Sequence, residues 1–504
     1  MILSRHILTQ LVSSREVQIP DQHLWKLPEK VLQFGTGVLL RGLPDYLIDQ
    51  ANKQGVFNGR IVMIKSTLHG DTLAYDAQDQ LYTQCIRGIH NGAGVDRCII
   101  NAAVSRVISA PHRWKEVLAC AADPELCLII SNTTEVGIAL STDSILANPP
   151  ETYPGKLLAL LYKRYQVFGG DPTKGFVIIP TELMEDNGKK LCTIIHQLAE
   201  INNLEPAFFQ WLDQANEFCN SLVDRIVPGK MSPDAERKIQ EELGYEDRLM
   251  ILSEPYALWA IETNREKTRQ LLSFSTTSDS VVMVPDIRPY RERKLRLLNG
   301  SHTFCCGLAL LAGFSTVREA MQNPGFYQFI EGLMREEISR ALLPEGIALE
   351  STEAFTRQVL DRFSNPYLDH KWLSITLQYS SKMRVRNIPV LLGYIQAYGQ
   401  LPARMCFGFA CYLLFMRSQK RDHSFFSTTT KQPCLISDDL APVLYQKWED
   451  NELPGLIHAV LEDEKLWGNS LSGISGLENS ILSYLEQLMQ KGVVEMLKDF
   501  QKAG

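Results

Sequence analysis

Two glycines in the segment VLQFGTGVLLRG (31–42) limit what this chain can fold into more than any other feature. An apolar run typical of a buried strand comes before them, and a helical pattern follows at once. Gly35 permits a tight turn, and Gly37 lets the backbone approach a phosphate group at the N-terminus of the helix. The segment therefore predicts a dinucleotide-binding turn that includes Thr36, with Leu40 where a third glycine is usual.

The next apolar run, RIVMIK (60–65), bears on which coenzyme binds. In NAD-binding proteins an acidic residue near the end of this strand holds the ribose 2′-hydroxyl. Here the run ends in Lys65, and the nearest acid is Asp71. Lys65 either contacts the 2′-phosphate of NADP or is a solvated charge at the strand end. These residues leave the choice between NAD and NADP open.

Short β-branched runs alternate with helical patterns in the first half of the chain, which is typical of an α/β sheet. From Lys294 onward the pattern is helical. We therefore predict an α/β Rossmann-type N-terminal domain over 1–285 and an all-α C-terminal domain over 286–504, which carries the substrate and catalytic residues. The predicted strands are Lys30–Phe34, Ile61–Ile64, Cys127–Ile130, Phe176–Ile179, Leu249–Leu252 and Val281–Val284.

Composition argues against several classes of function. The 504 residues carry a formal net charge of -7, which offers neither a basic face for nucleic acid nor a polybasic membrane anchor. No apolar run reaches the roughly 18 residues of a membrane span, and the first residues lack the apolar core of a secretory signal. Eleven cysteines without a C-x-x-C spacing indicate reduced thiols in a cytoplasmic protein. The ten histidines show no metal-ligand spacing, so we expect no metal site.

The segment PYRERKLRLLNGSHT (289–303) is the strongest candidate for chemistry, because it places Lys294, Asn299 and His302 at the start of a helical run. At about 100° per residue, His302 lies about 80° and Asn299 about 140° from the lysine, so all three share one broad helix face. Hydride transfer to a ketone leaves negative charge on oxygen, which must be hydrogen-bonded and protonated. Taken alone, the segment also fits an amphipathic helix with a solvated lysine.

The motif K-x-x-x-x-N-G-x-H, preceded by GTGxxxR, is similar to the motifs of polyol-specific long-chain dehydrogenases, a family that includes mannitol dehydrogenases. The resemblance implies that Lys294 is the general acid/base and that Asn299 and His302 position the reacting oxygen. It extends over most of the chain, including SNTTEVGI (131–138), NSLVDRIVP (220–228), SEPYALWAIE (253–262), RFSNPYLDH (362–370) and SSKMRVRNIP (380–389). The implied dinucleotide contacts are Gly35, Thr36, Gly37, Arg41, Asn132, Thr133 and Asp224, and Lys382 is implied on the substrate side.

Two departures from the mannitol enzymes concern the substrate. Leu183 stands where those enzymes have an asparagine that holds the substrate oxygen, so this contact passes to Asn187 or Asn299. Arg291 stands where they have a glutamate, three residues before the lysine. A guanidinium binds a carboxylate bidentately, whereas a neutral polyol gains nothing from it. Arg291 therefore predicts a sugar acid as substrate.

A second candidate for binding the carboxylate is an alternating basic cluster formed by Lys382, Arg384 and Arg386. We predict Lys382 and Arg384 as substrate contacts, and the alternative is a solvated basic face.

The resemblance implies reversible reduction of D-tagaturonate to D-altronate by NADH, with a small sugar acid as the partner. Reduction of fructuronate is a close alternative that differs only in stereochemistry. Oxidation of mannitol or of mannitol 1-phosphate is a more distant one. A protein that senses nucleotides without chemistry is an alternative from another class, although it has no use for a proton donor. The oligomeric state stays open.

Overall fold

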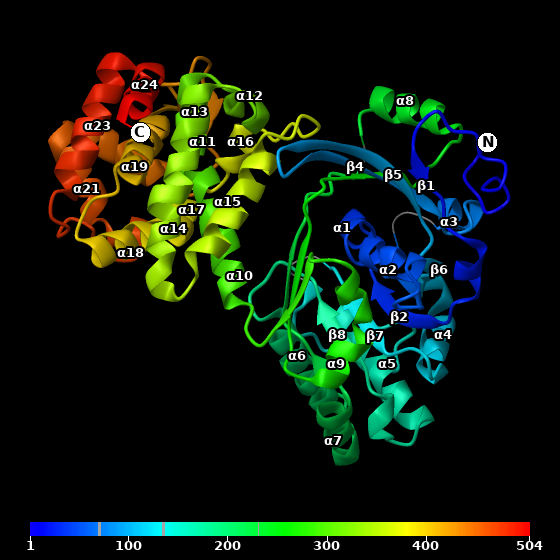
Figure 1. The fold of residues 1–504 in the computed structure, drawn as a ribbon. Helices are drawn as coiled ribbons and strands as arrows, with labels where there is room; N and C mark the ends of the chain where they lie inside the picture. The colour runs from blue at the N-terminus through cyan, green and yellow to red at the C-terminus, as the bar shows by residue number, and fades with distance from the viewer. Residues whose placement is uncertain (69–71, 134–136, 230, 504) are drawn as a thin grey trace. The chain divides into compact units, whose positions relative to one another are not determined.

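The computed structural model describes residues 1–68, 72–133, 137–229 and 231–503, and they divide into two compact units (Figure 1). The N-terminal unit comprises Met1–Arg87 and Gly94–Ile287. The helical unit comprises Gly88–Ala93 and the chain from Arg288 onward. The division falls two residues after the boundary that the sequence suggests.

Six parallel strands form the main sheet of the N-terminal unit, in the order β6-β3-β2-β7-β8-β9. The chain starts in the middle at β2, moves outward to β6, and returns to build the other half from β7. This is the strand order of doubly wound dinucleotide-binding folds, which bind their ligand where the order reverses. The reversal lies between β2 and β7. The strands are β2 (Glu29–Phe34), β3 (Arg60–Lys65), β6 (Val104–Ser109), β7 (Leu128–Ser131), β8 (Val177–Pro180) and β9 (Glu217–Phe218).

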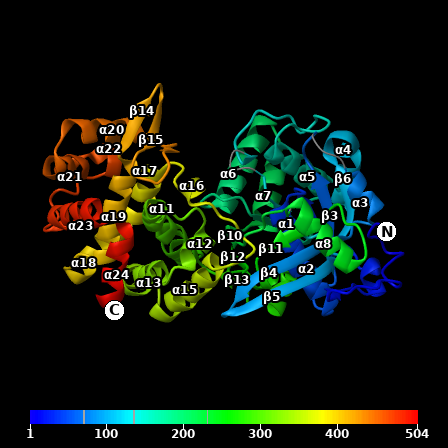
Figure 2. The ribbon, with the colours of Figure 1, turned by 90° about the horizontal axis from the view of Figure 1, so that it is seen from above.

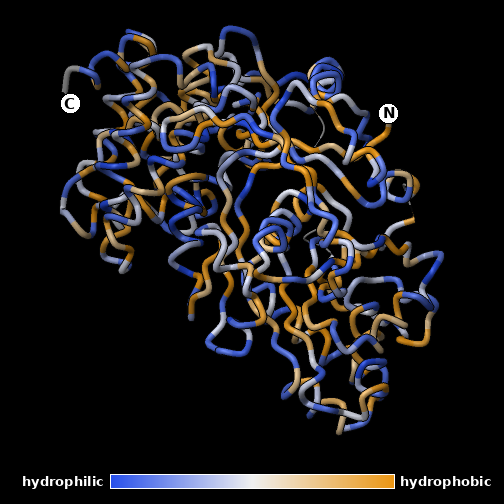
Figure 3. The backbone as a smooth tube through the Cα atoms, turned by 45° about the vertical axis from the view of Figure 1, so that its right-hand side comes forward, coloured by the Kyte–Doolittle hydropathy of each residue, from blue (hydrophilic) through white to orange (hydrophobic). Residues whose placement is uncertain are grey.

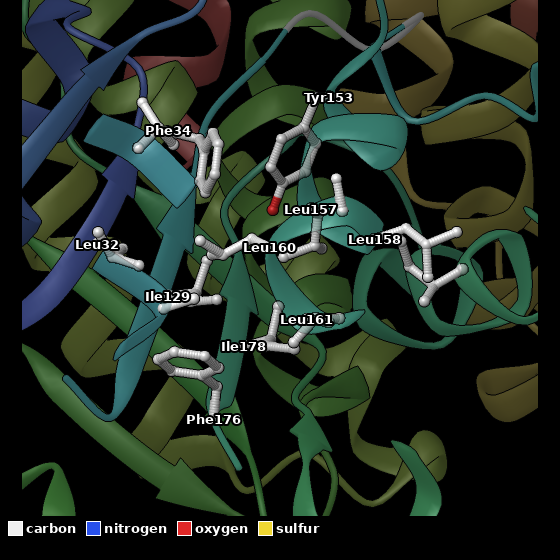
Figure 4. Packing of buried hydrophobic residues seen from close by; sticks show 14 of the residues in the cluster. Leu32, Phe34, Ile129, Tyr153, Leu157, Leu158, Leu160, Leu161, Phe176 and Ile178 are labelled. Atoms are coloured by element: carbon white, nitrogen blue, oxygen red, sulfur yellow. The ribbon is translucent and has the colours of Figure 1, made fainter. Parts of the chain in front are cut away.

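Both faces of this sheet are covered, which explains why its strands are continuous apolar runs. Alternate residues of β2 point to opposite faces, so Leu32 and Phe34 join one core and Val31 the other. Figure 4 shows Phe34 beside Tyr153 of the covering helix α5, with ring centroids 5.1 Å apart. Helices α4 (Ala110–Ala119), α5 (Tyr153–Val167), α6 (Asn187–Ile201) and α7 (Pro206–Ala215) cover the first face, and α1 (Val38–Gly42) and α2 (Pro44–Lys53) pack on the second.

Two smaller sheets complete the N-terminal unit. One has the order β1-β5-β4-β11, and the other, β10-β12-β13, packs on the second face of the main sheet. All six predicted strands exist, but the last two of them lie in these smaller sheets as β11 and β13. The strands are β1 (Val17–Gln18), β4 (Tyr82–His90), β5 (Ala93–Asn101), β10 (Ser221–Asp224), β11 (Ile251–Ser253), β12 (Leu258–Glu262) and β13 (Val281–Val284), and the remaining α-helices are α3 (Leu73–Ala77), α8 (Pro233–Leu243) and α9 (Glu266–Leu271).

The helical unit is built around α19 (Ala403–Met416), whose side chains are buried on all sides from Met405 to Met416. A helix that is apolar all round belongs in a core, and α19 packs against α11 (Ser301–Ala312) and α23 (Leu477–Lys491) (Figure 2). Figure 3 shows hydrophobic and hydrophilic residues alternating along the surrounding helices. These are α10 (Arg288–Arg293), α12 (Val317–Met321), α13 (Pro324–Gly332), α14 (Ser339–Leu342), α15 (Leu349–Phe363), α16 (Trp372–Ile375), α17 (Tyr379–Lys382), α18 (Ile388–Tyr398), α20 (Ala441–Asp450), α21 (Leu453–Glu462), α22 (Glu464–Trp467) and α24 (Val493–Ala503).

This unit differs from the all-α prediction in two respects. A small antiparallel sheet joins β14 (Ser418–Arg421), β15 (Ser424–Ser427) and β16 (Cys434–Leu435). The tip of the β4–β5 hairpin, Gly88–Ala93, also belongs to the helical unit, where the Gly92 N–H donates to Asp361 Oδ2 at 3.2 Å. In the described part of the chain, no helix combines the length and the apolar character needed to cross a bilayer.

Candidate functional site

The turn after β2 requires glycine at position 35. Its backbone has φ +132°, a conformation that side chains disfavour. Its N–H donates to Ile64 O at 3.0 Å. A Cβ atom here would lie 2.9 Å from Leu40 Cδ1 and 3.1 Å from Asn132 O. Gly35 therefore lets β2, β7 and α1 converge at the reversal of strand order.

Gly37 has a different reason to be glycine. It is the N-cap of α1, with φ -66° and ψ 158°, which any residue adopts. No atom of the protein lies within 4 Å of the position that its Cβ would occupy. The space above Gly37 is thus open on the side where a Cβ would project, beside the N-terminal N–H groups of α1. This arrangement fits the close approach of a pyrophosphate.

Arg41 is predicted as a dinucleotide contact, but the structure engages its side chain elsewhere. The guanidinium is buried, its Nη1 donates to Leu249 O at 2.6 Å, and it lies over the Tyr82 ring at 5.2 Å. The Tyr82 hydroxyl donates in turn to Arg41 O at 2.9 Å. Arg41 thus links α1 to the segment before β11, and its contact with a dinucleotide stays a prediction.

A buried carboxylate, Glu182, organises the loops after β7 and β8. Its Oε1 accepts from the N–H of Thr133 at 2.8 Å and from Thr133 Oγ1 at 3.1 Å, and its Oε2 accepts from Ser131 Oγ at 3.2 Å. Asn132 Nδ2 donates to Thr181 O at 3.1 Å. Burial raises the pKa of Glu182, while these hydrogen bonds oppose the rise. The predicted contacts Asn132 and Thr133 are thus held next to Gly35, and residues 134–136 of the same motif lie outside the described residues.

Asn187 does not fit the predicted role of substrate contact. Its Nδ2 lies 3.1 Å from Pro180 O and 3.0 Å from Ser221 O, and its Oδ1 accepts from the N–H groups of Gly188 and Ser221, both at 2.9 Å. The amide is 1% exposed. Asn187 therefore ties α6 to β8 and β10 and has no donor left for a ligand. Leu183, by contrast, is exposed.

Lys65 and Asp224 both end strands and are both buried. Lys65 Nζ donates to Thr67 O within its own loop, so the side chain is not the solvated charge that was one of its two interpretations. Asp71, the nearest acid, lies outside the described residues. Asp224 ends β10 and is engaged by other residues.

Asp45 of α2 is linked to the turn after β2 through the side chain of Gln33. Its Oδ2 lies 3.3 Å from the Tyr82 hydroxyl oxygen and accepts from Gln33 Nε2 at 3.5 Å, and the same Gln33 nitrogen donates to Gly35 O at 3.3 Å. Complete burial is the main reason that the pKa of Asp45 rises to about 7. The folded protein therefore binds this proton more tightly than the unfolded chain does.

The pH dependence of stability follows from that shift. Because the folded pKa is raised, the stabilisation from Asp45 is complete below about pH 4 and is lost as pH rises through about 7. We expect the free energy of unfolding, relative to an Asp45→Asn variant, to fall by roughly 3 kcal/mol between pH 5 and pH 8. Urea denaturation of both proteins over this range measures it, and parallel pH profiles would contradict the prediction.

In the helical unit, Lys294 and Asn299 lie in a π-helical segment, Lys294–Gly300, set between α10 and α11. In a π-helix each N–H bonds to the carbonyl five residues back, so residues five apart lie one above the other. Lys294 and Asn299 are five apart. The 140° separation expected from a regular α-helix does not apply here, because the wide turn brings the two residues toward the same face of the helix.

A second π-helical segment, Met383–Asn387, packs against the first. Arg296 Nη1 donates to the carbonyl oxygens of Val385 and Arg386 at 2.7 and 2.9 Å. Asn387 Nδ2 donates to Gly300 O at 3.3 Å. Side chains of each π-helical segment thus donate hydrogen bonds to backbone carbonyl groups of the other. The two segments that carry the catalytic candidates are therefore tied to each other by hydrogen bonds.

His302 follows on α11 and is 9% exposed. Its ring stacks on Phe363 at 4.0 Å and meets His370 and Trp372 edge-on at 5.4 and 5.7 Å. Burial, followed by the charges of nearby basic residues, holds the pKa of His302 well below its usual value. The imidazole is therefore neutral, with one nitrogen that donates and one that accepts.

The predicted basic residues separate into two groups. Lys382 is half-buried, and its Nζ donates to Ile375 O at 2.9 Å. Arg386 is also half-buried, and its Nη1 donates to Thr303 Oγ1 at 3.3 Å. Arg384 is exposed, with Nη2 3.3 Å from the position a Cβ of Gly468 would take. Arg386 thus contacts Thr303, the residue after His302, and the substrate contacts of Lys382 and Arg384 stay predictions. Arg291 lies on α10 and is engaged by other residues.

The chain matches two domain families in succession. Residues 29–273 match the mannitol dehydrogenase Rossmann domain, and residues 286–489 match the mannitol dehydrogenase C-terminal domain. The chain belongs to the mannitol dehydrogenase family. It is an oxidoreductase that acts on CH–OH groups.

Two curated relatives of this mannitol dehydrogenase family member have the same name. An altronate oxidoreductase from Bacillus subtilis (strain 168) is 38% identical over 483 residues, which cover 95% of this chain and 96% of the relative. An altronate oxidoreductase from Escherichia coli O1:K1 / APEC is 35% identical over 481 residues, 94% of this chain and 96% of the relative. These similarities extend across both units.

Two solved structures share the fold of this family member. The ternary complex of Pseudomonas fluorescens mannitol 2-dehydrogenase with NAD and D-mannitol has a TM-score of 0.69 at 21% identity, and each chain is covered completely. A substrate-free D-sorbitol dehydrogenase has a TM-score of 0.77 at 20% identity, covering 98% of this chain and 99% of the other.

Three residues of this site are absent from the sequence-based prediction. Glu182 follows directly on the predicted strand Phe176–Ile179 and its Pro-Thr pair, so its place at a strand end was the signal available. His370 meets the His302 ring, and the charge of Arg362 acts on it; they are the last and first residues of RFSNPYLDH (362–370), so the resemblance of that segment was the signal available. The described residues contain no group of three side chains able to hold a metal ion.

Proposed function

We propose that this chain reduces D-tagaturonate to D-altronate with NADH in a reversible reaction. The observation that carries the proposal is the combination of Lys294 and Asn299 on one π-helical face with the basic side chains near His302. Relatives named altronate oxidoreductase, at 35 to 38% identity over nearly the whole chain, support this substrate. Reduction of fructuronate, an epimeric keto-uronate, is the second candidate, because the same cations would bind its carboxylate.

The residues after β2 and β7 fit a bound dinucleotide. Gly35 makes the turn, the open space above Gly37 admits the pyrophosphate, and Asn132 and Thr133 border the turn. When bound, NADH supplies a hydride to the carbonyl carbon of the substrate. We propose NAD over NADP, and the support is that Lys65 is buried and its Nζ already donates to Thr67 O, which makes it less available to a 2′-phosphate.

The chemical step assigned to the protein is proton transfer. As the hydride arrives at carbon, negative charge builds on the carbonyl oxygen, and Lys294 Nζ donates its proton there. The Asn299 amide and the neutral imidazole of His302 hydrogen-bond the same oxygen and hold it in place. In the direction of oxidation, Lys294 accepts the proton of the hydroxyl. The eleven cysteines, none of them in a disulfide, support a reducing compartment, which we take to be the cytoplasm.

The test is optical measurement of NADH and NADPH oxidation with D-tagaturonate, D-fructuronate and D-fructose offered separately. We expect rapid turnover of tagaturonate with NADH and little turnover of fructose, which lacks the carboxylate. Faster turnover of fructuronate than of tagaturonate would establish the second candidate. Turnover of fructose with both keto-uronates inert would overturn the proposal.

A further inference from the structure

Two buried cysteines, Cys85 and Cys98, face each other across the β4–β5 hairpin. Cys85 lies on β4, Cys98 lies on the neighbouring strand β5, and their Sγ atoms are 2.8 Å apart. A disulfide bond is about 2.05 Å long, so less than about 1 Å separates the two sulfurs from bonding distance. Residues directly opposite each other in a hairpin have Cα atoms roughly 4.5–5.5 Å apart, which a disulfide spans. The backbone therefore already suits a bond between them.

An ion pair beside the thiols shows which residues of the two strands are opposite each other. Arg87 Nη2 lies 2.9 Å from Asp96 Oδ2. Arg87 comes two residues after Cys85, and Asp96 comes two residues before Cys98. Because alternate residues of a strand point to the same face, the thiols and the ion pair are consecutive cross-strand pairs on one face of the sheet.

Arg15 lies over the same face of the hairpin. Its Nη2 pairs with Asp96 Oδ1, and its Nη1 lies 2.8 Å from Glu242 Oε2 at the end of α8. Both carboxylates fix the guanidinium in position, and Asp96 is only one cross-strand step from the thiols. Two arginines, Arg15 and Arg87, are therefore held next to Cys98 by contacts that do not involve the sulfur.

These surroundings make Cys98 unlike a cysteine that serves only as a small apolar side chain. A hydrogen bond from the Cys85 thiol lowers the pKa of Cys98, and the charges of Arg15 and Arg87 lower it further, against burial, which raises it. The same hydrogen bond and burial raise the pKa of Cys85. By contrast, burial alone raises the pKa of Cys411 well above its usual value. Cys98 is thus the thiol of the pair that ionises first.

We propose that Cys85 and Cys98 form an oxidisable dithiol site, in which Cys98 reacts with a peroxide and Cys85 then closes a reversible disulfide. Neither cysteine belongs to the dinucleotide turn or to the catalytic segment. Cys98 is 2% exposed, so the oxidant has to be small, as hydrogen peroxide is. A disulfide that forms only under oxidation suits a compartment that otherwise keeps thiols reduced.

The chemistry balances with one molecule of hydrogen peroxide. The Cys98 thiolate attacks one peroxide oxygen, the O–O bond breaks, and hydroxide leaves, so that Cys98 becomes a sulfenic acid. The Cys85 sulfur then attacks the Cys98 sulfur, the S–S bond forms, and the S–O bond breaks. The sulfenic oxygen leaves as water with the proton of the Cys85 thiol. The two thiols lose two electrons in all, peroxide is reduced to two waters, and an excess of a small dithiol reverses the bond by exchange.

Peptide mapping of the full-length protein tests the site. Reduced protein is treated with hydrogen peroxide, alkylated in denaturant and digested with trypsin, which places the two cysteines in separate peptides, 66–87 and 98–106. We expect these peptides to appear joined, two hydrogen atoms lighter than their sum, and to separate after dithiothreitol. Cys120 is the internal control, because it is buried with its Sγ 3.7 Å from Arg106 Nη2 but is not paired with a thiol among the described residues. It should remain available for alkylation.

Serine variants show which thiol reacts first. In Cys85→Ser the sulfenic acid of Cys98 has no thiol to attack it, so dimedone should trap it. In Cys98→Ser we expect Cys85 to remain a thiol. Arg15→Gln should slow disulfide formation at neutral pH roughly 10-fold, the effect of one pKa unit on the thiolate fraction. Arg237→Gln, exposed on α8, should react as wild type does, and thermal melting checks that each variant is folded.

Three results would overturn the proposal. The first is complete alkylation of Cys85 and Cys98 at peroxide concentrations that already oxidise Cys120, since the pair would then be core residues only. The second is a bond from either cysteine to a third one. The third is equal trapping by dimedone in the two serine variants, which would remove the distinction between the reacting thiol and its partner.

Discussion

Replacement of Lys294 by alanine is expected to lower kcat by roughly 10²- to 10⁴-fold, the usual contribution of a general acid, and to leave the affinity for NADH unchanged. The reason is that Lys294 lies on the π-helical segment of the helical unit, whereas the dinucleotide turn is built by residues of the other unit. Steady-state assays with D-tagaturonate give kcat, and the quenching of NADH fluorescence gives the affinity. Small primary amines should restore part of the rate.

Lys420→Ala is the control for this experiment, because Lys420 is exposed on β14 of the same unit. It should match wild type in both measurements. If Lys294→Ala turned over at the wild-type rate, another group would be the proton donor. If wild-type protein bound NADH and reduced none of the ketones, the chain would be a sensor without chemistry.

Gly35→Ala is expected to have the largest effect on the nucleotide-binding half. The new methyl group would meet Leu40 Cδ1 at 2.9 Å and Asn132 O at 3.1 Å, in a backbone conformation with φ +132°. Strain and overpacking together should cost roughly 2–5 kcal/mol of folding free energy. Binding of NADH should be lost with the turn. Thermal unfolding and fluorescence titration measure the two effects.

Gly37→Ala is the matched comparison, since the same methyl group meets no protein atom within 4 Å. Its melting temperature should stay close to that of wild type, while NADH binds at least roughly 10-fold more weakly because the methyl group occupies the space left for the pyrophosphate. Equal loss of stability in both variants would mean that Gly37 serves the fold and not the coenzyme.

The main sheet was predictable because parallel strands buried on both faces are continuous apolar runs. Four of the predicted runs became β2, β3, β7 and β8. The edge strand β6, VSRVIS, was not predicted, because Arg106 and two serines interrupt its apolar character. The small sheet β14–β16 was not predicted because its strands are only two to four residues long and contain no apolar run of more than two residues.

The chemical type of the candidate site residues was predictable from the sequence, but the partners of their side chains were not. Arg41 and Asn187 carry the right groups for a ligand, yet Leu249 O takes the first and backbone groups of β8 and β10 take the second. Nothing local in the sequence reveals such long-range partners. Arg384 and Arg386 look equivalent in M-R-V-R-N, and only the packing of the π-helical segment on α11 tells them apart.

The wide turn at Lys294–Gly300 accommodates one residue more between Lys294 and Asn299 than an α-helical turn does. Deleting any one of the four residues between them would return the helix to ordinary α register. Lys294 and Asn299 would then be four residues apart, about 40° from each other, and would still share one helix face. The wide turn is therefore equivalent to a single inserted residue, and a relative without it can be aligned with a gap inside this segment that keeps both side chains matched.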